Sequence, residues 1–309
     1  MTRPSPALLA LSYLATCIIW GSTYFAIKLA LASFSPLFLS GARYAVAAVL
    51  GWGVARALGI AFPGPFRQWW PVFGVGILFI TIANSTVCWA EVRLDSAYVA
   101  LIMTTSTLWT AMLAPLIAGD PWPRPRAWLG IGIGLAGTVL LIEPWKASAP
   151  DLGAALAVSC SVIVWAAGAN WIRRIKTTIH PFAMAIGQMA VGAAVLLLIT
   201  VPRGDTLIAP ITPSSGLAIG FLVIFGSLIA FGAYFYLLEH WDAAKVSTSA
   251  YVNPVIALSL GVGLLGERLT WTMGLGTVIV LSGVTLVLLD QHRAPVVTVA
   301  EPPLKVELR

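Results

Sequence analysis

The sequence consists largely of apolar runs, each about twenty residues long, which short polar segments separate. An α-helix of roughly 20 apolar residues spans the hydrocarbon core of a bilayer. Within lipid, a backbone must satisfy its own polar groups, so such runs have to be helices. Charged residues make up only 10% of the chain, against about 25% in soluble domains. We therefore expect an all-α integral membrane protein.

Ten apolar runs can be counted, and each is expected to cross the membrane once. The first is expected to be retained rather than cleaved as a signal peptide, because its Trp20 has a counterpart deep in the chain. Residues 1–6 should form a short cytoplasmic tail, and the proline-containing residues 291–309 a disordered one. The approximate bounds of the runs are 7–27, 36–55, 71–90, 96–118, 127–142, 152–172, 181–201, 216–238, 245–265 and 271–289.

The second half of the chain repeats features of the first half. Trp20 matches Trp165 at a distance of 145 residues, and Gly119-Asp120 matches Gly266-Glu267 at a distance of 147. The match is closest around Trp241-Asp242, which corresponds to Leu94-Asp95. Self-similarity at a fixed distance indicates a duplicated structural unit.

Each unit contains five spans, with residues 7–145 forming the first unit and 146–290 the second. Because five is odd, the two copies cross the membrane in opposite directions. The expected fold is therefore ten transmembrane helices arranged as two inverted five-helix repeats. Such repeats are typical of secondary transporters, although a duplicated, purely structural bundle is the alternative.

The basic residues predict the orientation of the chain. With the N-terminus inside, twelve Lys and Arg residues lie in inside loops and tails and five in outside loops. The positive-inside rule then places both termini in the cytoplasm. We expect the protein to reside in the cell (inner) membrane.

Several function classes lack support in the sequence. Cys17, Cys88 and Cys160 lie within apolar runs without metal-ligand spacing, and no phosphate-binding loop or nucleophile elbow occurs. The net charge of +6 sits in short loops rather than on a nucleic-acid-binding surface. We expect no enzyme activity, no cofactor, no metal and no nucleic-acid partner; the partners are the lipid bilayer and a small-molecule substrate. The oligomeric state is open, with a monomer among the alternatives.

Several motifs, in this order and repeat spacing, resemble the drug/metabolite transporter superfamily. They are Trp20-Gly21-Ser22-Thr23-Tyr24, Arg43-Tyr44, Asn253-Pro254 and Gly266-Glu267-Arg268-Leu269. The chain is most similar to the ten-span EamA family, and within it to YddG-type exporters of aromatic and other neutral amino acids. The resemblance implies a ten-helix basket with a central cavity and cytoplasmic termini. The first half departs from the pattern, with Gly119-Asp120 where the family often has a Gly-Glu pair.

Polar residues in the third and eighth spans are candidates for substrate binding. Thr81 and Asn84 share a helix face, and Tyr234 lies in the eighth span, the repeat mate of the third. An amide both donates and accepts, so Asn84 suits a zwitterion. The alternative is a hydrogen bond between helices that holds the bundle together.

Aromatic side chains in the spans are the second group of candidates. Trp20 and Trp165 are repeat mates that would line a cavity from opposite sides and stack on a substrate. Tyr24 and Trp109 would extend this surface. Trp89, Tyr98 and Tyr251 could add to it, with a place in the aromatic belt at the membrane interface as the alternative for these three.

A proline within the ninth span is the third candidate feature. Pro254 donates no backbone hydrogen bond, so a carbonyl one turn earlier is free. With Ser249 and Asn253 this carbonyl would form a polar notch for substrate. The same proline would act as a hinge, or as an ordinary kink.

Charged residues near the spans are gating or contact candidates. Arg43 is a possible carboxylate contact, although we favour a structural role in which it reaches toward one surface or binds carbonyls. Glu91 and Glu239 lie near span ends as possible gate charges paired with Arg93 or Lys245, with a solvated turn position favoured for each. With no acidic residue in mid-span, facilitated efflux or exchange is favoured over proton antiport.

These features together predict a secondary transporter that exports small amphipathic metabolites by alternating access through a central cavity. Neutral and aromatic amino acids are the favoured substrates. A multidrug exporter of lipophilic cations would need a carboxylate in the cavity. A channel would show flux that does not saturate, and a receptor or enzyme is disfavoured because the spans contain no convergent catalytic groups.

Overall fold

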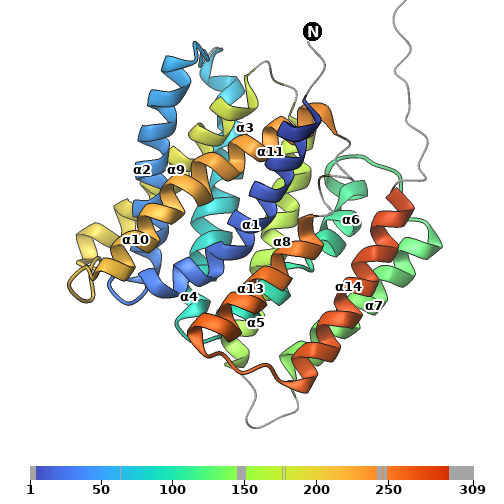
Figure 1. Cartoon of the computed structure of the whole chain (residues 1–309). Helices are drawn as coiled ribbons and strands as arrows, with labels where there is room; N and C mark the ends of the chain where they lie inside the picture. The colour runs from blue at the N-terminus through green and yellow to red at the C-terminus, as the bar shows by residue number, and fades with distance from the viewer. Residues whose placement is uncertain are drawn as a thin grey trace, which may run out of the picture.

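A computed structural model of the chain describes residues 5–62, 64–144, 151–175, 177, 179–241, 246 and 249–291. These residues form helices joined by short turns, without a β-sheet, so the all-α prediction is confirmed (Figure 1). The helices are α1 (Pro6–Ala30), α2 (Pro36–Ala57), α3 (Phe66–Gly76), η1 (Ile77–Asn84), α4 (Ser85–Glu91), α5 (Ser96–Met103), α6 (Ser106–Ile117), α7 (Pro125–Ile142), α8 (Leu152–Arg174), α9 (Pro181–Thr200), η2 (Val201–Arg203), α10 (Pro213–Phe221), η3 (Leu222–Ile229), α11 (Ala230–His240), α13 (Ser249–Leu265) and α14 (Trp271–Gln291).

Proline marks the start of many of these helices. Pro6, Pro36, Pro125, Pro181 and Pro213 each occupy the first helical turn. At this position the missing N–H costs nothing and the fixed φ angle suits the helix. Pro36 and Pro181 are repeat mates, so the second span of each repeat begins with the same residue.

Nine helices in the described part are long and apolar enough to cross a membrane, when continuous segments such as α3–η1–α4 are joined. This finding confirms a multi-pass membrane protein. The one remaining predicted span, the ninth, contains α13, which has 17 residues in the described part. Residues 242–245 and 247–248, which precede it and carry part of the repeat motif, lie outside the described residues.

The third and eighth spans both change helix type at the same place. The segments η1 and η3 are π-helical, and their bounds lie 145 residues apart. Single π-helical turns within α-helices frequently occur at functional sites. The fourth span also changes, because a turn at Thr104 and Thr105 separates α5 from α6.

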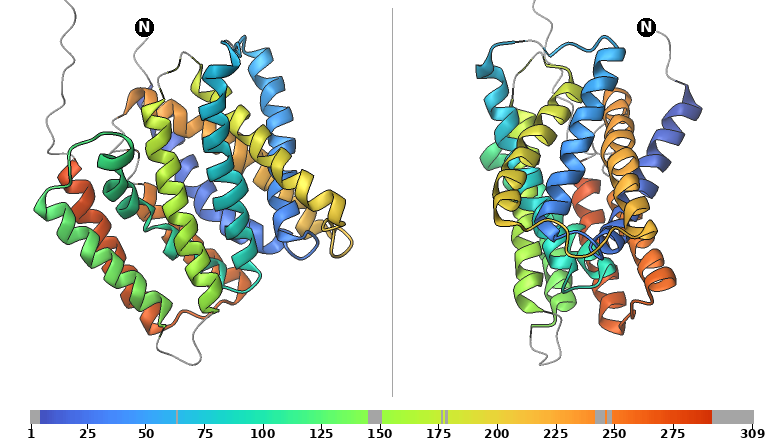
Figure 2. Two further views of the ribbon diagram at one scale, coloured as in Figure 1. Left: turned by 180° about the vertical axis from the view of Figure 1, so that it is seen from behind. Right: turned by 90° about the vertical axis from the view of Figure 1, so that its left-hand side faces the viewer.

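The fifth and tenth spans, α7 and α14, pack against each other as inverted mates. A Cβ atom added at Gly283 would lie 2.5 Å from Gly130 O, and one added at Gly137 would lie 2.8 Å from Val280 N. Residue numbers therefore rise along one helix as they fall along the other, so the mates are antiparallel. Figures 1 and 2 show the two helices side by side at one edge of the molecule.

The second and seventh spans, α2 and α9, form a corresponding pair. Gly41 faces Leu196, whereas Gly51 faces Ile186. Leu196 is the repeat mate of Gly51, and Ile186 is the mate of Gly41, so the contacts are exchanged between the copies. Such reciprocity is the property of a two-fold interface. The two repeats are thus related by a pseudo-two-fold axis. This axis passes between α2 and α9 and between α7 and α14.

The turns before the fifth and tenth spans have the same backbone form. Gly119 and Gly266 have φ angles of 82° and 70°, a region in which a side chain is strained. The following amides also match, because Asp120 N donates to Ala114 O and Glu267 N to Gly261 O. The start of α1 and the end of α14 lie at the same end of the molecule, as an even number of crossings requires (Figure 1).

Candidate functional site

Aromatic side chains of the first and sixth spans pack onto the opposite repeat. Trp165 of α8 stacks on Phe79 of η1, with ring centroids 4.3 Å apart and planes tilted by 19°. Its mate Trp20 of α1 contacts Phe231 and Tyr234 of α11, at centroid distances of 5.6 Å and 5.1 Å. Each indole therefore packs against the third span of the other repeat, and the two indoles do not stack on each other.

A small cavity lies between these helices. Its wall consists of Tyr44, Phe79, Ile80, Asn84, Trp165, Ala185, Gln188, Met189 and Phe231. The predicted residues Asn84 and Trp165 line it, Trp20 adjoins it through Phe231, and Tyr234 packs against Trp20. The volume is about 10 Å³, enough for one water molecule.

Gln188, which lies 145 residues after Arg43, is a member of this wall that was not among the predicted site residues. It is buried in the middle of α9 and brings a second amide to the cavity. The available signal was a neutral polar residue within an apolar span, since such residues turn toward the interior of a bundle.

The two predicted polar residues of the third span point in different directions. Asn84 Nδ2 donates to Phe79 O (3.3 Å) while the side chain remains at the cavity wall. Thr81 Oγ1 donates to Gly192 O of α9 (3.1 Å), so Thr81 joins two helices. In the mate segment, Ser227 likewise donates to the carbonyl five residues earlier, Leu222 O (3.0 Å). Side chains thus satisfy carbonyls in both π-helical segments.

Of the two structural roles expected for Arg43, reaching toward a surface is contradicted, because its side chain lies inside the bundle. Its side chain is buried, its Nε donates to Ser227 Oγ of η3 (3.0 Å), and its guanidinium lies over the Tyr44 ring at 4.6 Å. A buried charge needs such partners, because unpaired burial is costly. Arg43 therefore links α2 to the opposite repeat and does not line the cavity.

The residues around Pro254 join α13 to α1. The carbonyl oxygens of Cys17 and Ser249 lie 3.1 Å and 3.2 Å from one end of the Asn253 side-chain amide, so the amide nitrogen is assigned to that end, where it donates to both. Ser249 is buried and Pro254 lies inside α13, as expected. None of these three predicted residues lines the cavity. The Asn253 contact with Cys17 O is a hydrogen bond between helices, of the kind that holds a membrane bundle together.

Tyr24 and Trp109 belong to a different part of the bundle. Both are partly buried and pack against the largest cluster of buried apolar side chains, which includes residues of α1, α4, α5, α7 and α14. Neither lines the cavity. The predicted aromatic surface is therefore divided between the cavity and this core.

At one end of the molecule, Glu267 bridges the two repeats. Its Oε1 accepts from Ser96 N and Ser96 Oγ (2.7 Å each), and its Oε2 accepts from Ala97 N (3.0 Å). Asp95, which precedes α5, makes no capping bond, so the cap comes from the other repeat. A carboxylate at this position satisfies free amides and favours the helix dipole. We call this contact the Glu267 cap.

The Glu267 cap supports one direct prediction. Glu267→Gln keeps an acceptor oxygen but loses the charge, so the free energy of unfolding should fall by about 1 kcal/mol. Thermal unfolding in detergent would measure this. The exposed neighbour Arg268 supplies the control, because Arg268→Gln should change stability by less than about 0.5 kcal/mol. Equal losses in both variants would contradict the role of the cap.

The two glutamates predicted as gates have different outcomes. Glu91 has no exposed surface, which contradicts a solvated turn position. It is not paired with Arg93, which instead lies 3.5 Å from Asp151 and over the Trp89 ring. The backbone of Glu239 belongs to α11, but its side chain and Lys245 lie outside the described residues.

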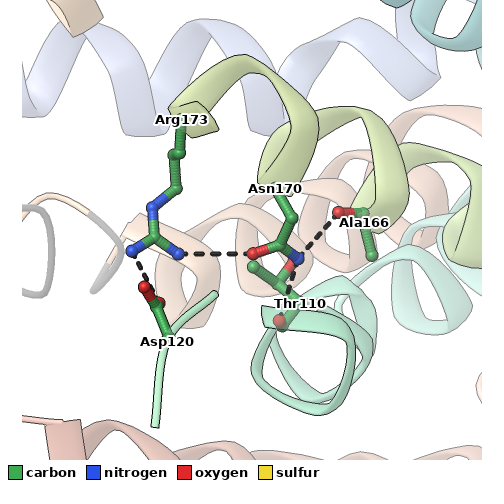
Figure 3. Close-up of polar contacts among 5 residues, drawn as sticks. All are labelled: Thr110, Asp120, Ala166, Asn170 and Arg173. Atoms are coloured by element: carbon green, nitrogen blue, oxygen red, sulfur yellow. Dashed lines mark hydrogen bonds and ion pairs between the residues drawn. The ribbon is translucent and has the colours of Figure 1, made fainter. Parts of the chain in front are cut away.

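At the opposite end, Arg173 forms a second bridge between the repeats (Figure 3). Its Nη2 lies 2.7 Å from Asp120 Oδ2, and its Nη1 donates to Asn170 Oδ1 (3.3 Å). Asn170 is fully buried and donates to Thr110 O and Ala166 O, each at 3.0 Å. Asp120 thus pairs with an arginine, whereas its repeat mate Glu267 caps a helix at the other end of the molecule. An exposed ion pair of this kind contributes about 0–1 kcal/mol, so it opens easily.

The chain is similar over most of its length to known membrane transporters. The sequence profile of the EamA-like transporter family matches residues 7–143 and again residues 152–289. The chain is 35% identical over 289 residues to the uncharacterized inner membrane transporter YedA of Escherichia coli, covering 93% of each chain.

More distant relatives extend this picture. The chain is 28% identical over 283 residues to protein PecM of Dickeya dadantii, covering 89% of this chain and 90% of PecM. It is 23% identical over 285 residues to an Escherichia coli protein named a probable amino-acid metabolite efflux pump, covering 86% and 90% of the two chains. One crystal structure matches with a TM-score of 0.65 at 19% identity, covering 93% of this chain and 99% of the other, which supports the fold alone.

Proposed function

Because the chain belongs to the EamA-like transporter family, we propose that it exports small amphipathic metabolites, with neutral and aromatic amino acids as substrates. Family membership makes the chain a multi-pass membrane transporter and not an enzyme.

The composition of the cavity wall is the observation that carries this substrate class. Asn84 and Gln188 bring amides, which donate and accept and therefore suit both ends of a zwitterion. Phe79, Trp165 and Phe231 bring aromatic rings on which an apolar side chain can stack. The wall draws on both repeats, which is where transporters of this architecture bind their substrates.

The small volume of the cavity supports alternating access. Small-molecule sites commonly occupy roughly 300–1,000 Å³, whereas this cavity has about 10 Å³. The wall must therefore separate before a metabolite enters. The Glu267 cap and the Arg173–Asp120 pair both join one repeat to the other, at opposite ends. We propose that each breaks when its end opens.

The proposed orientation has both termini in the cytoplasm of a cell with an inner membrane. The twelve-to-five distribution of basic residues supports it. In this orientation the Glu267 cap closes the outer end, and the Arg173–Asp120 pair lies at the cytoplasmic end.

Transport by the purified protein in liposomes tests the proposal. We expect saturable uptake of labelled phenylalanine and leucine, weaker uptake of threonine, and little uptake of lysine, whose charged side chain does not suit an aromatic wall. Asn84→Ala should lower kcat/KM for phenylalanine transport by about tenfold, because a hydrogen bond to a charged group contributes about 1.5–3 kcal/mol. Trp20→Ala should have a smaller effect, since Trp20 adjoins the cavity through Phe231.

Three results of the same transport assay would contradict the proposal. Saturable transport of tetraphenylphosphonium without amino-acid uptake would establish the multidrug alternative. Flux that rises linearly with concentration would indicate a channel. Equal rates for wild type and Asn84→Ala would remove the cavity as the binding site.

A further inference from the structure

Glu91 is an anomaly among the acidic residues that the structure describes. Its side chain has no exposed surface, and neither carboxylate oxygen has a hydrogen-bond partner. By contrast, Asp120 and Glu267 bind partners, and Asp205 is exposed. An ionisable group buried in a membrane protein is a functional candidate, because it is costly to keep there.

The charges nearest to Glu91 are already committed to other groups. Lys28 of α1 donates its Nζ hydrogens to the backbone carbonyls of Glu91 (2.5 Å) and Leu94 (2.8 Å). Arg43 of α2 donates from Nε to Ser227, and Glu267 accepts from the start of α5. These charges act on the carboxyl from a distance, together with the titratable groups Tyr24 of α1 and Cys88 of its own helix.

Glu91 also shares a helix face with the cavity. It lies seven residues, or two turns, after the cavity residue Asn84. The two positions are therefore roughly 10 Å apart along the same side of the third span. Glu91 thus sits between the cavity and the Glu267 cap, at a junction of the two repeats.

The close packing around Glu91 restricts what it can bind. Neither the central cavity nor the surface pocket beside Trp70 and Trp171 includes Glu91 in its lining. A substrate ammonium group or a metal ion would need space and further ligands. A proton needs neither, and it removes the charge that burial penalises.

We propose that Glu91 is a proton-binding site that couples proton entry to substrate export. When the outer end opens, water reaches the carboxylate and it accepts one proton. After the outer end closes and the cytoplasmic end opens, the O–H bond breaks and the proton passes to water on the inside. One proton enters for each substrate exported, and the proton gradient supplies the driving force. The coupling to export rests on the proposed function, whereas proton binding does not.

Transport in liposomes tests the coupling. In wild type, an imposed pH gradient should drive accumulation of phenylalanine, while exchange at equal pH needs no net proton movement. Glu91→Gln mimics the protonated side chain, so gradient-driven accumulation should fall by about fivefold or more while exchange persists. Asp205→Asn, an exposed acid in a loop, is the control and should retain both activities. Wild-type transport that ignores the gradient, or full gradient-driven transport by Glu91→Gln, would overturn the proposal.

A second measurement needs no substrate and separates this inference from the proposed function. The melting temperature of the purified protein should fall as the pH rises from about 5 to about 8, because in this range the unfolded chain releases the Glu91 proton while the folded protein still holds it. The curve for Glu91→Gln should be flatter, and that for Asp205→Asn should follow wild type. Identical curves for all three proteins would overturn the proton site, even if amino-acid transport were established. A flatter dependence of the melting temperature on pH in Glu91→Gln than in wild type would support the proton site on its own. It would do so even if the protein transported no amino acid, or if Glu91→Gln abolished exchange as well.

Discussion

Replacing Trp165 with alanine is expected to lower kcat/KM for phenylalanine transport by at least about tenfold, equivalent to about 1.4 kcal/mol of binding energy. Trp165 forms one wall of the cavity and stacks on Phe79 across the contact between repeats. The change removes both the surface for an apolar substrate and the support of the opposite wall. Initial rates of phenylalanine uptake over a range of concentrations would measure the loss.

Two further variants show whether this loss belongs to the cavity. Trp165→Phe keeps a ring against Phe79 and should retain much more activity than Trp165→Ala. Trp52, on α2, has 55% of its surface exposed in the bundle, so Trp52→Ala should leave transport unchanged. Comparable losses for Trp52→Ala and Trp165→Ala would show that general destabilisation, rather than the cavity, explains the effect.

The largest effect on stability is expected at the contact between α7 and α14. A Cβ atom at Gly283 would lie 2.5 Å from Gly130 O and 2.5 Å from Gly134 N. Backbone atoms cannot rotate away, so the helices would have to separate along their whole contact. Gly283→Ala should therefore lower the free energy of unfolding by about 1–3 kcal/mol, as overpacking does elsewhere. Thermal unfolding in detergent would measure the loss.

The chain offers a matched control on each helix of this pair. A Cβ atom at Gly132 of α7 or Gly274 of α14 would meet nothing within 4 Å. Gly132→Ala and Gly274→Ala should be neutral, or stabilising by up to about 1 kcal/mol because alanine favours helix. If Gly283→Ala were as stable as these controls, the close approach of the two helices would be wrong.

The sequence alone was sufficient for the class of protein and its repeat. Span length is a local property set by bilayer thickness, and prolines and glycines mark helix starts and turns wherever they occur. The repeat followed from matched residues such as Trp20 and Trp165. The packing of each indole onto the other repeat agrees with that match.

The direction of each polar side chain needed the tertiary structure. Thr81 and Asn84 share a helix face in sequence, yet the π-helical turn and α9 bring one to Gly192 and the other to the cavity. Arg43 is turned inward because Ser227, 184 residues later, supplies an acceptor.

Glu91 illustrates the limit of sequence reasoning most clearly. It stands at the end of an apolar run, where a turn in water and a buried position look the same. Only the packing of other helices around α4, chiefly α2 and α8, decides that its carboxyl has no exposed surface. Local pattern thus determined which segments cross the membrane. The contacts between the two repeats, which join residues far apart in sequence, decided which side chains face the cavity, the core or each other.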